Sequence, residues 1–315
     1  MSSLRERKLT LLVSSMSARG RVLGSSRKIV EILRGGGWDV TAVTTTAEHD
    51  IHATAAEMRS QAGYAGALGG DGFITKVANG LHGQGVPLIP FPSGRGNDLC
   101  RSLGIGPHAQ PWARLLADAT AEQVQQWTGP LDAMEVTPLD GGPSNIALGI
   151  ISLGIDAKAN ELANESWICF GPLAYAAGAI SAFLGKFKPQ TVEVEVGGEK
   201  KTVGGWLCSI SNSGWFGGGV NLVAHSDTAD GTLELLSVAP VPRLEILPVL
   251  TRVLLSRGAN DPMIEEMAVT ELKVLEPTGM VAMADGDVVA KIPFSVRVLP
   301  GALDVVAANA KELGK

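Results

Sequence analysis

Two glycine-rich segments have the residue types and spacing to bind a phosphate. The first reads Leu68-Gly69-Gly70-Asp71-Gly72; it follows an apolar run and precedes a helical pattern. Glycines at a strand-to-helix turn let backbone amides approach a phosphate, and a helix N-terminus adds partial positive charge. Asp71 would lie beside the phosphates and would need a divalent cation such as Mg²⁺ to neutralise it. A tight turn capped by Asp71 is an equally good interpretation of this segment alone.

The second segment, Pro92-Ser93-Gly94-Arg95-Gly96-Asn97-Asp98, follows the next apolar run, residues 87–91. Loops at the ends of successive parallel strands can face one crevice, which is where open α/β sheets bind ligands. Asn97 and Asp98 could also cap the helix that follows, and the two roles are compatible. The pair of loops therefore predicts a phosphate-binding edge of a sheet.

A pair of carboxylates near the end of the chain could act in proton transfer. Asp285 and Asp287 are separated by Gly286. From an extended segment, residues two apart point to the same side, so that one carboxylate could accept a proton while the other orients it or binds metal. An Asp-Gly hairpin turn is the equally weighted alternative.

Two other segments in the second half of the chain place a carboxylate or a glycine-rich backbone at a turn. Ala229-Asp230-Gly231-Thr232 places another carboxylate at a turn, again with a plain hairpin as the alternative. The segment 212–219, Asn-Ser-Gly-Trp-Phe-Gly-Gly-Gly, offers a backbone that could come close to a ligand, or a bulged turn.

Histidine and cysteine usage excludes several other chemistries. His49 and His52 are three residues apart without a third ligand nearby, and a solvated helix face explains them better than a metal site. The sequence lacks a G-x-S-x-G nucleophile motif. Cys100, Cys169 and Cys208 have neither metal-ligand nor disulfide spacing, which favours a cytoplasmic protein with reduced cysteines.

The elements that must position the glycine loops alternate along the first third of the chain. Apolar runs predict strands at 9–13, 39–43, 64–68 and 87–91, and helical patterns occur at 25–33, 47–61 and 73–81. Ser25 and Ser26 are candidate N-caps of the first helix. The alternation predicts βαβ units around a parallel sheet, continuing to about Trp127.

After Gly129 and Pro130 the pattern changes to β segments joined by glycine turns. Strands are predicted at 146–151, 191–196, 202–211, 232–238, 268–275, 280–283, 292–299 and 303–306. The uncharged run 168–185 contains three glycines and a proline, which favour a buried or pocket-lining helix over a membrane span. The second half therefore predicts a β-rich domain with inserted helices.

Composition sets the broad class. The 315 residues include 26 basic and 32 acidic side chains, a net charge of −6, so no nucleic-acid partner and no broad basic membrane surface are indicated. The N-terminal residues 1–15 mix charges and do not predict a signal peptide.

The order of these motifs resembles the diacylglycerol kinase catalytic-domain family, which includes bacterial lipid kinases and the sphingosine and ceramide kinases. The resemblance covers nearly the whole chain. It is carried by the two glycine loops, Asn79-Gly80-Leu81, Leu103-Gly104, Leu131-Asp132, the segments 154–157, 171–175 and 217–219, Asp230-Gly231-Thr232-Leu233, and Asp285-Gly286-Asp287.

This resemblance implies the fold and the activity. It implies an α/β nucleotide-binding domain of NAD-kinase type, residues 1–129 with a returning segment 300–315, and a β-sandwich-type lipid-substrate domain, residues 130–299. The implied reaction is transfer of the γ-phosphoryl group of ATP, with Mg²⁺, to the hydroxyl of a lipid such as diacylglycerol or a sphingoid base. An inactive pseudokinase and an NAD kinase are the alternatives. The implied location is cytoplasmic with transient membrane contact, and a homodimer is suggested by analogy.

The resemblance also assigns roles to single residues. Asp285 would be the general base and Asp287 an orienting or metal-linked carboxylate. The nucleotide would contact Gly69, Gly70, Asp71, Gly72, Ser93, Gly94, Arg95, Gly96, Asn97 and Asp98. Metal contacts would come from Asp71, Asp98, Asp132, Asp227, Asp230 and Thr232. The helix 172–184 would wall the lipid pocket.

Departures from the family pattern gather at the nucleotide loops. Ser14-Ser15 stands where the family has Asn-Pro, and Phe73 stands where it has Thr. Thr75-Lys76 replaces Asn-Glu, and Arg95 replaces a small residue. Because Arg binds phosphate in a bidentate manner, Arg95 and Lys76 could compensate for the lost polar contacts. The acceptor lipid, the nucleotide preference and the oligomeric state are left open by the sequence.

Overall fold

The computed structural model describes residues 5–15, 22–46, 50–58, 63–153, 189–254 and 262–308. The chain forms two compact units. Unit 1 comprises residues 1–131 and 301–315, and unit 2 comprises residues 132–300. Strands β5 (Thr128–Pro138) and β18 (Phe294–Val306) carry the chain from one unit to the other.

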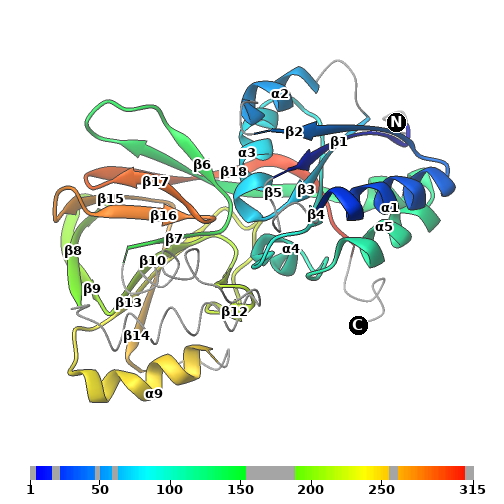
Figure 1. Ribbon diagram of the computed structural model, residues 1–315. Coiled ribbons are helices and arrows are strands. Elements are labelled where there is room, and N and C mark those ends of the chain that lie inside the picture. The colour runs from blue at the N-terminus through cyan, green and yellow to red at the C-terminus, as the bar shows by residue number, and fades with distance from the viewer. Residues whose placement is uncertain are drawn as a thin grey trace. The chain divides into compact units, whose positions relative to one another are not determined.

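Unit 1 is built on a parallel sheet with the order β2-β1-β3-β4 (Figure 1). The end of β18 extends it, with Val305 beside Leu88 in parallel. The predicted strands are present as β1 (Lys8–Ser14), β2 (Asp39–Thr45), β3 (Tyr64–Gly69) and β4 (Leu88–Pro92). Strands β3 and β4 are buried at every residue, as expected of parallel strands covered on both faces.

Helices cover both faces of this sheet. They are α1 (Val22–Gly35), α2 (Ile51–Glu57), α3 (Asp71–Leu81), α4 (Asp98–Ser102), α5 (Ala109–Asp118) and α6 (Ala121–Gln126). The chain crosses from β1 to β2 in one direction and from β2 to β3 in the other. Right-handed crossovers therefore place α1 and α2 on opposite faces, and Figure 1 shows α1 beside α5 and α2 beside α3.

Two predicted helix starts are wrong. Helix α1 begins at Val22, so that Ser25 and Ser26 lie inside it and do not cap it. The helix is anchored instead by fully buried Ile29 and Leu33. Helix α3 begins at Asp71, two residues before the predicted start, directly after the first glycine pair.

Unit 2 is a β-sandwich. One sheet contains β8 (Gln190–Val196), β9 (Glu199–Gly205), β15 (Glu271–Glu276) and the first half of β18, with β5 and β6 (Asn145–Ala147) beside it. The other has the order β14-β13-β10-β7-β16-β17. Its strands are β7 (Ile150–Ser152), β10 (Leu207–Ser211), β13 (Leu233–Val238), β14 (Ile264–Val269), β16 (Val281–Ala284) and β17 (Asp287–Lys291). Buried Val194, Ile210 and Phe294 share the core between the two sheets.

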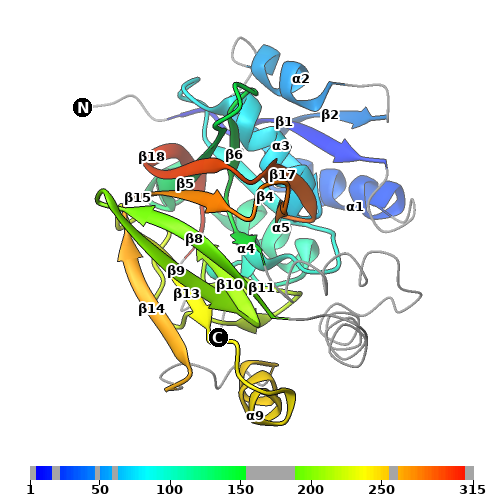
Figure 2. The ribbon, with the colours of Figure 1, turned by 90° about the vertical axis from the view of Figure 1, so that its left-hand side faces the viewer.

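A second apolar cluster covers the outer side of the β13–β10 sheet. Helix α9 (Arg243–Leu254) contributes Ile246 and Val249, which pack with Trp206 and Leu236. Figure 2 shows α9 at one end of the strands β13 and β14. The short hairpin β11 (Trp215–Phe216) and β12 (Val220–Asn221) joins the same cluster through Phe216 and Val220.

The predicted fold class, an α/β unit followed by a β-sandwich, is confirmed, but several predicted strands have different limits. Predicted strand 202–211 is two strands, because Gly204 and Gly205 have positive φ angles and break the ladder before Trp206. Strand 268–275 is divided at Thr270, and 146–151 is divided at Leu148. Strands 292–299 and 303–306 are one strand, β18.

Some predictions lie outside the described residues. They concern His49, Cys169, the motifs 154–157 and 171–175, and the helix 172–184. Within the part of the chain that the structure describes, no helix is long and apolar enough to cross a bilayer.

Candidate active site

The two glycine loops of unit 1 touch each other through their backbones. The N–H of Ser93 donates a 2.7 Å hydrogen bond to the carbonyl of Gly69. A Cβ atom on Gly94 would lie 2.5 Å from the Cα of Gly70, too close for any side chain. The structure thus brings the two predicted loops together at the carboxyl ends of β3 and β4, and glycine is required at the contact.

The first loop leads directly into the N-terminus of helix α3. Gly70 occupies the N-cap position, and its carbonyl accepts from the N–H groups of Phe73 and Ile74, both at 3.0 Å. Phe73 lies against the loop, since a Cβ on Gly69 would be 2.5 Å from its Cδ1 atom. Polarised amides at the start of an 11-residue helix favour an anion here.

Asp71 and Asp98 form a carboxylate pair beside these loops. A Cβ on Gly96 would lie 2.9 Å from Oδ2 of Asp71 and 3.0 Å from Oδ2 of Asp98, so both carboxylates flank Gly96. Oδ1 of Asp71 accepts a hydrogen bond from the N–H of Leu99 at 3.2 Å. Burial, together with the charge of Asp98, raises the pKa of Asp71 to about 7.

This carboxylate pair could bind a divalent cation whose coordination shell is completed by other ligands. Two carboxylates in one place repel each other, and Mg²⁺ is commonly held by one or two carboxylates together with phosphate oxygens and water. Among the described residues, no group of three or more His, Cys, Asp or Glu side chains could hold a metal ion. A metal at Asp71 and Asp98 would therefore take its remaining ligands from phosphate and water.

Asn97 is the N-cap residue of helix α4, and its side chain closes the second loop. It has a left-handed backbone with φ of 55°. Its Oδ1 accepts from the N–H of Gly94 at 2.7 Å, and its Nδ2 donates to the carbonyls of Gly94 and Pro107. The predicted N-cap position of Asn97 is confirmed, and its carbonyl accepts from the N–H of Arg101 at 3.0 Å. Its side chain makes no cap hydrogen bond, because the loop uses both ends of the amide, and Asp71 supplies a side-chain acceptor for the N–H of Leu99 in α4. Arg95 is exposed at the tip of this loop, and Lys76 is exposed on α3.

Asp285 lies in a two-residue hairpin turn of unit 2. Asp285 and Gly286 have φ angles of 52° and 89°, and Ala284 pairs with Asp287 across the hairpin. These are the angles of a type I′ turn, which Asp-Gly favours. The prediction that Asp285 and Asp287 project from one extended segment is therefore wrong: Asp285 is half-buried in the turn, whereas Asp287 is exposed at the start of β17.

The carboxylate of Asp285 is held against residues Leu148 and Gly149. Its Oδ2 accepts from the N–H of Leu148 at 3.1 Å. A Cβ on Gly149 would be 2.4 Å from its Oδ1. The break between β6 and β7, which the sequence did not predict, provides this seat for the carboxylate.

The other predicted metal ligands lie together in unit 2. Asp132 is 1% exposed, and its Oδ2 accepts from the N–H of Gly231 at 2.7 Å. Asp227 accepts from the N–H of Ala229, and Asp230 from the N–H and hydroxyl of Thr232. Asp227 and Asp230 thus stabilise their own turn, as the hairpin interpretation expects for Asp230.

Asn212 is a buried residue whose side chain the sequence did not single out. Its Nδ2 donates to the carbonyls of Asp132 at 3.1 Å and Leu148 at 2.9 Å. The signal available was the polar first residue of the segment 212–219, which was interpreted only for its backbone.

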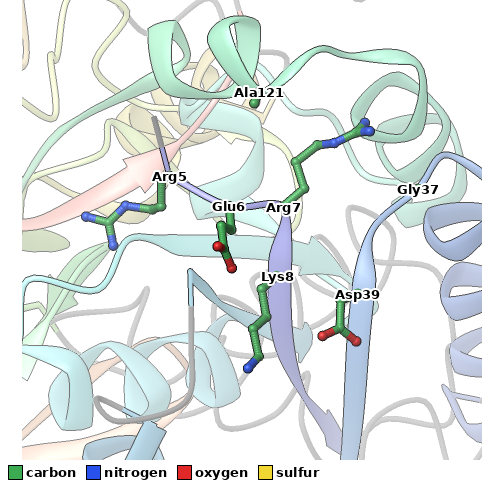
Figure 3. A pocket seen from close by; sticks show the side chains of 7 residues that line it. All are labelled: Arg5, Glu6, Arg7, Lys8, Gly37, Asp39 and Ala121. Atoms are coloured by element: carbon green, nitrogen blue, oxygen red, sulfur yellow. The ribbon is translucent and has the colours of Figure 1, made fainter. Parts of the chain in front are cut away.

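A groove of about 470 Å³ lies at the opposite edge of the unit 1 sheet (Figure 3). It is lined by Arg5, Glu6, Arg7, Lys8, Gly37, Asp39 and Ala121. Strands β1 and β2 begin here, with Lys8 beside Asp39, whereas the glycine loops follow strand ends. Arg5 donates to the carbonyls of Gly63 and Gly85, and Arg7 donates to that of Ala119. These arginines join loops together, so the groove is a weaker candidate than the glycine loops.

The fold and the site together define a class: an α/β unit with two adjoining glycine loops, followed by a β-sandwich that holds a carboxylate in a hairpin turn. Comparison with known families agrees. Residues 8–136 match the diacylglycerol kinase catalytic domain, and residues 149–307 match the YegS C-terminal NAD kinase beta sandwich-like domain. The chain belongs to this diacylglycerol kinase family.

Individual relatives cover nearly the whole chain. A protein of Mycobacterium tuberculosis (strain H37Rv) named diacylglycerol kinase is 26% identical over 303 residues, which is 95% of this chain and 94% of that protein. A solved structure described as a diacylglycerol kinase from Bacillus anthracis matches with a TM-score of 0.75 and 18% identity, covering 99% of this chain and 100% of the other. The latter likeness concerns the fold.

Proposed function

We propose that this protein transfers the γ-phosphoryl group of ATP to the hydroxyl of a lipid alcohol such as diacylglycerol or a sphingoid base. The proposal rests on one observation, the backbone contact between Gly70 and Gly94. This contact brings two glycine-rich loops together at the N-terminus of α3. Membership of the diacylglycerol kinase family supports it, as does the M. tuberculosis relative named for that activity.

The nucleotide phosphates bind at the two loops, residues 69–72 and 93–98. Backbone N–H groups and the helix N-terminus supply the attraction, since the protein as a whole is acidic. Arg95 adds a positive charge from the loop tip. Asp71 and Asp98 hold Mg²⁺, which neutralises phosphate charge when it is bound.

Asp285 acts as the general base for the lipid hydroxyl. As the acceptor oxygen forms its bond to the γ-phosphorus, the bond from that phosphorus to the ADP oxygen breaks, and the hydroxyl proton passes to Asp285. The N–H of Leu148 keeps the carboxylate in one orientation. Exposed Asp287 is assigned the secondary role of orienting the acceptor. Two further roles remain predictions. Asp98 and Asp132 would join a water and metal network behind the site, and Asp230, with the backbone carbonyls of Asp227 and Thr232, would form a structural Mg²⁺ site.

The test is transfer of labelled phosphate from [γ-³²P]ATP with Mg²⁺ to a mixed lipid extract. Wild type is expected to label a lipid, and Asp285→Asn is expected to lose about 10² to 10⁴-fold in rate, the usual contribution of a general base. Asparagine keeps an oxygen for the N–H of Leu148, so the change removes the proton acceptor and preserves the seat. Asp287→Asn, in the same turn but exposed, is the matched control and should lose less.

Three outcomes separate this proposal from its alternatives. A labelled lipid that disappears with Asp285→Asn supports the kinase. ATP binding without a product favours a pseudokinase, and phosphate transfer to NAD in a parallel assay makes the protein an NAD kinase. The cytoplasmic location, the transient contact with a membrane surface and the homodimer remain predictions.

A further inference from the structure

Asn212 is almost completely buried in unit 2 and donates three hydrogen bonds there. Its side chain is 1% exposed. Its backbone N–H donates to the carbonyl of Gly149 at 3.0 Å, while Nδ2 donates to the carbonyls of Leu148 and Asp132. Three hydrogen bonds thus connect this one residue to two other segments of the chain.

The two carbonyls fix which way the Asn212 amide points. If the amide were reversed, its oxygen would face the carbonyl oxygens of Leu148 and Asp132, and two acceptors would repel each other. Nδ2 carries two hydrogens, and each has one acceptor. The side chain therefore acts as a clamp with a single orientation.

The clamped segment is the one that seats Asp285. The carbonyls of Leu148 and Gly149 are held by Asn212, and the N–H of Leu148 donates to the Asp285 carboxylate. The same segment interrupts β6 and β7, so that strand pairing does not fix its orientation there. A shift of the Leu148–Gly149 segment would move the N–H of Leu148 away from the carboxylate.

We propose that Asn212 is a positioning residue for Asp285, acting through the Leu148–Gly149 segment. This inference rests on the proposed function, in which Asp285 accepts the proton of the lipid hydroxyl. Asn212 contributes by holding the general base in one place, since a misplacement of about 1 Å can cost about a hundredfold in rate.

The test is a double-mutant cycle that joins Asn212→Ala with Asp285→Asn. Asn212→Ala alone is expected to lower kcat about ten- to a hundredfold and to change KM for ATP less than about threefold, because the nucleotide loops belong to the other unit. In the Asp285→Asn background, the same change should cost less than about twofold, because the residue through which Asn212 acts has already lost its function. Equal losses in both backgrounds would show a general structural role and overturn the proposal.

A control variant and a second measurement keep the test decisive. Asn145→Ala removes an amide hydrogen bond to the carbonyl of Val289 in the same unit, and it should leave kcat within about twofold of wild type. Cooperative unfolding of Asn212→Ala would show that the variant is still folded. In that folded variant, hydrogen exchange of the Leu148 amide should accelerate at least about tenfold. Unchanged exchange in a folded variant would refute the clamp. If wild type transfers no phosphate, the proposed function fails, and the exchange result still decides whether Asn212 holds the seat of Asp285.

Discussion

Replacing Gly149 by Ala tests the seat of Asp285 with the addition of one methyl group. The new Cβ would lie 2.4 Å from Oδ1 of Asp285, whereas ordinary contacts begin at 3.4 Å. The carboxylate must therefore retreat by about 1 Å. The other nearest atoms, Cγ of Asp285 at 3.6 Å and Oγ of Ser213 at 3.9 Å, are already at ordinary distances.

The substitution should affect the reaction far more than the fold. Gly149 does not have a positive φ angle, so alanine is compatible with its backbone. The atom in the way is the end of a flexible side chain, and the entropy that alanine removes from the unfolded chain stabilises by about 0.4 to 1 kcal/mol. We expect the free energy of unfolding to change by less than about 1 kcal/mol. A base displaced by about 1 Å should lower kcat about a hundredfold, or about 2.7 kcal/mol in activation free energy.

The assay is steady-state phosphorylation of the lipid that the labelling experiment identifies, with thermal unfolding measured on the same preparations. Gly129→Ala is the matched control, because no atom lies within 4 Å of its new Cβ and its φ angle is not positive. That variant should keep the wild-type kcat. A Gly149→Ala enzyme with wild-type kcat would refute the argument that the position of the Asp285 carboxylate limits the rate.

Three further predictions concern the nucleotide loops. Gly94→Ala should lower ATP affinity at least about tenfold, because its Cβ would meet the rigid backbone of Gly70 and force the loops apart; equilibrium binding at wild-type strength would contradict this. Asp71→Asn should raise the free energy of unfolding in metal-free buffer at pH 8 by up to about 4 kcal/mol and leave it unchanged near pH 3. The folded protein holds the proton up to about pH 7, whereas the unfolded chain releases it at about pH 4, the ordinary pKa of Asp. Wild type therefore loses stability as pH rises from about 4 to about 7, and denaturant titrations across that range measure the effect. Arg95→Ala should weaken ATP binding about three- to tenfold, and an unchanged dissociation constant would remove Arg95 from the phosphate site.

Local patterns in the sequence predicted the parallel sheet and its two loops well. Strands such as β3 are continuous apolar runs that end in glycine, and a strand-turn-helix order needs no distant information. Limits were less accurate where glycines interrupt a ladder, as at Gly204 and Gly205, because the sequence does not show which glycines take positive φ angles.

The arrangement around Asp285 could not be predicted, because it depends on distant contacts. The Asp-Gly pair was compatible with a turn and with an extended strand, and the turn formed because the strands on either side pair with each other. Asn212 is 80 residues from Asp132 and 64 from Leu148, its two side-chain partners. Hydrogen bonds at such separations leave no periodic pattern in the sequence.

Asp71 and Asp285 are held by the same structural device, which determines how they should be tested. Each accepts a backbone N–H from a distant segment, Leu99 for Asp71 and Leu148 for Asp285, and each lies against a glycine that leaves room for it. An alanine substitution would leave that N–H without its acceptor, at a cost of about 1 to 3 kcal/mol, and would mix a folding defect with a chemical one. Asparagine keeps an acceptor oxygen of the same size and removes only the charge and the ability to accept a proton. Loss of activity in Asp285→Asn with normal unfolding can therefore be attributed to proton transfer, whereas the same loss in an alanine variant could not.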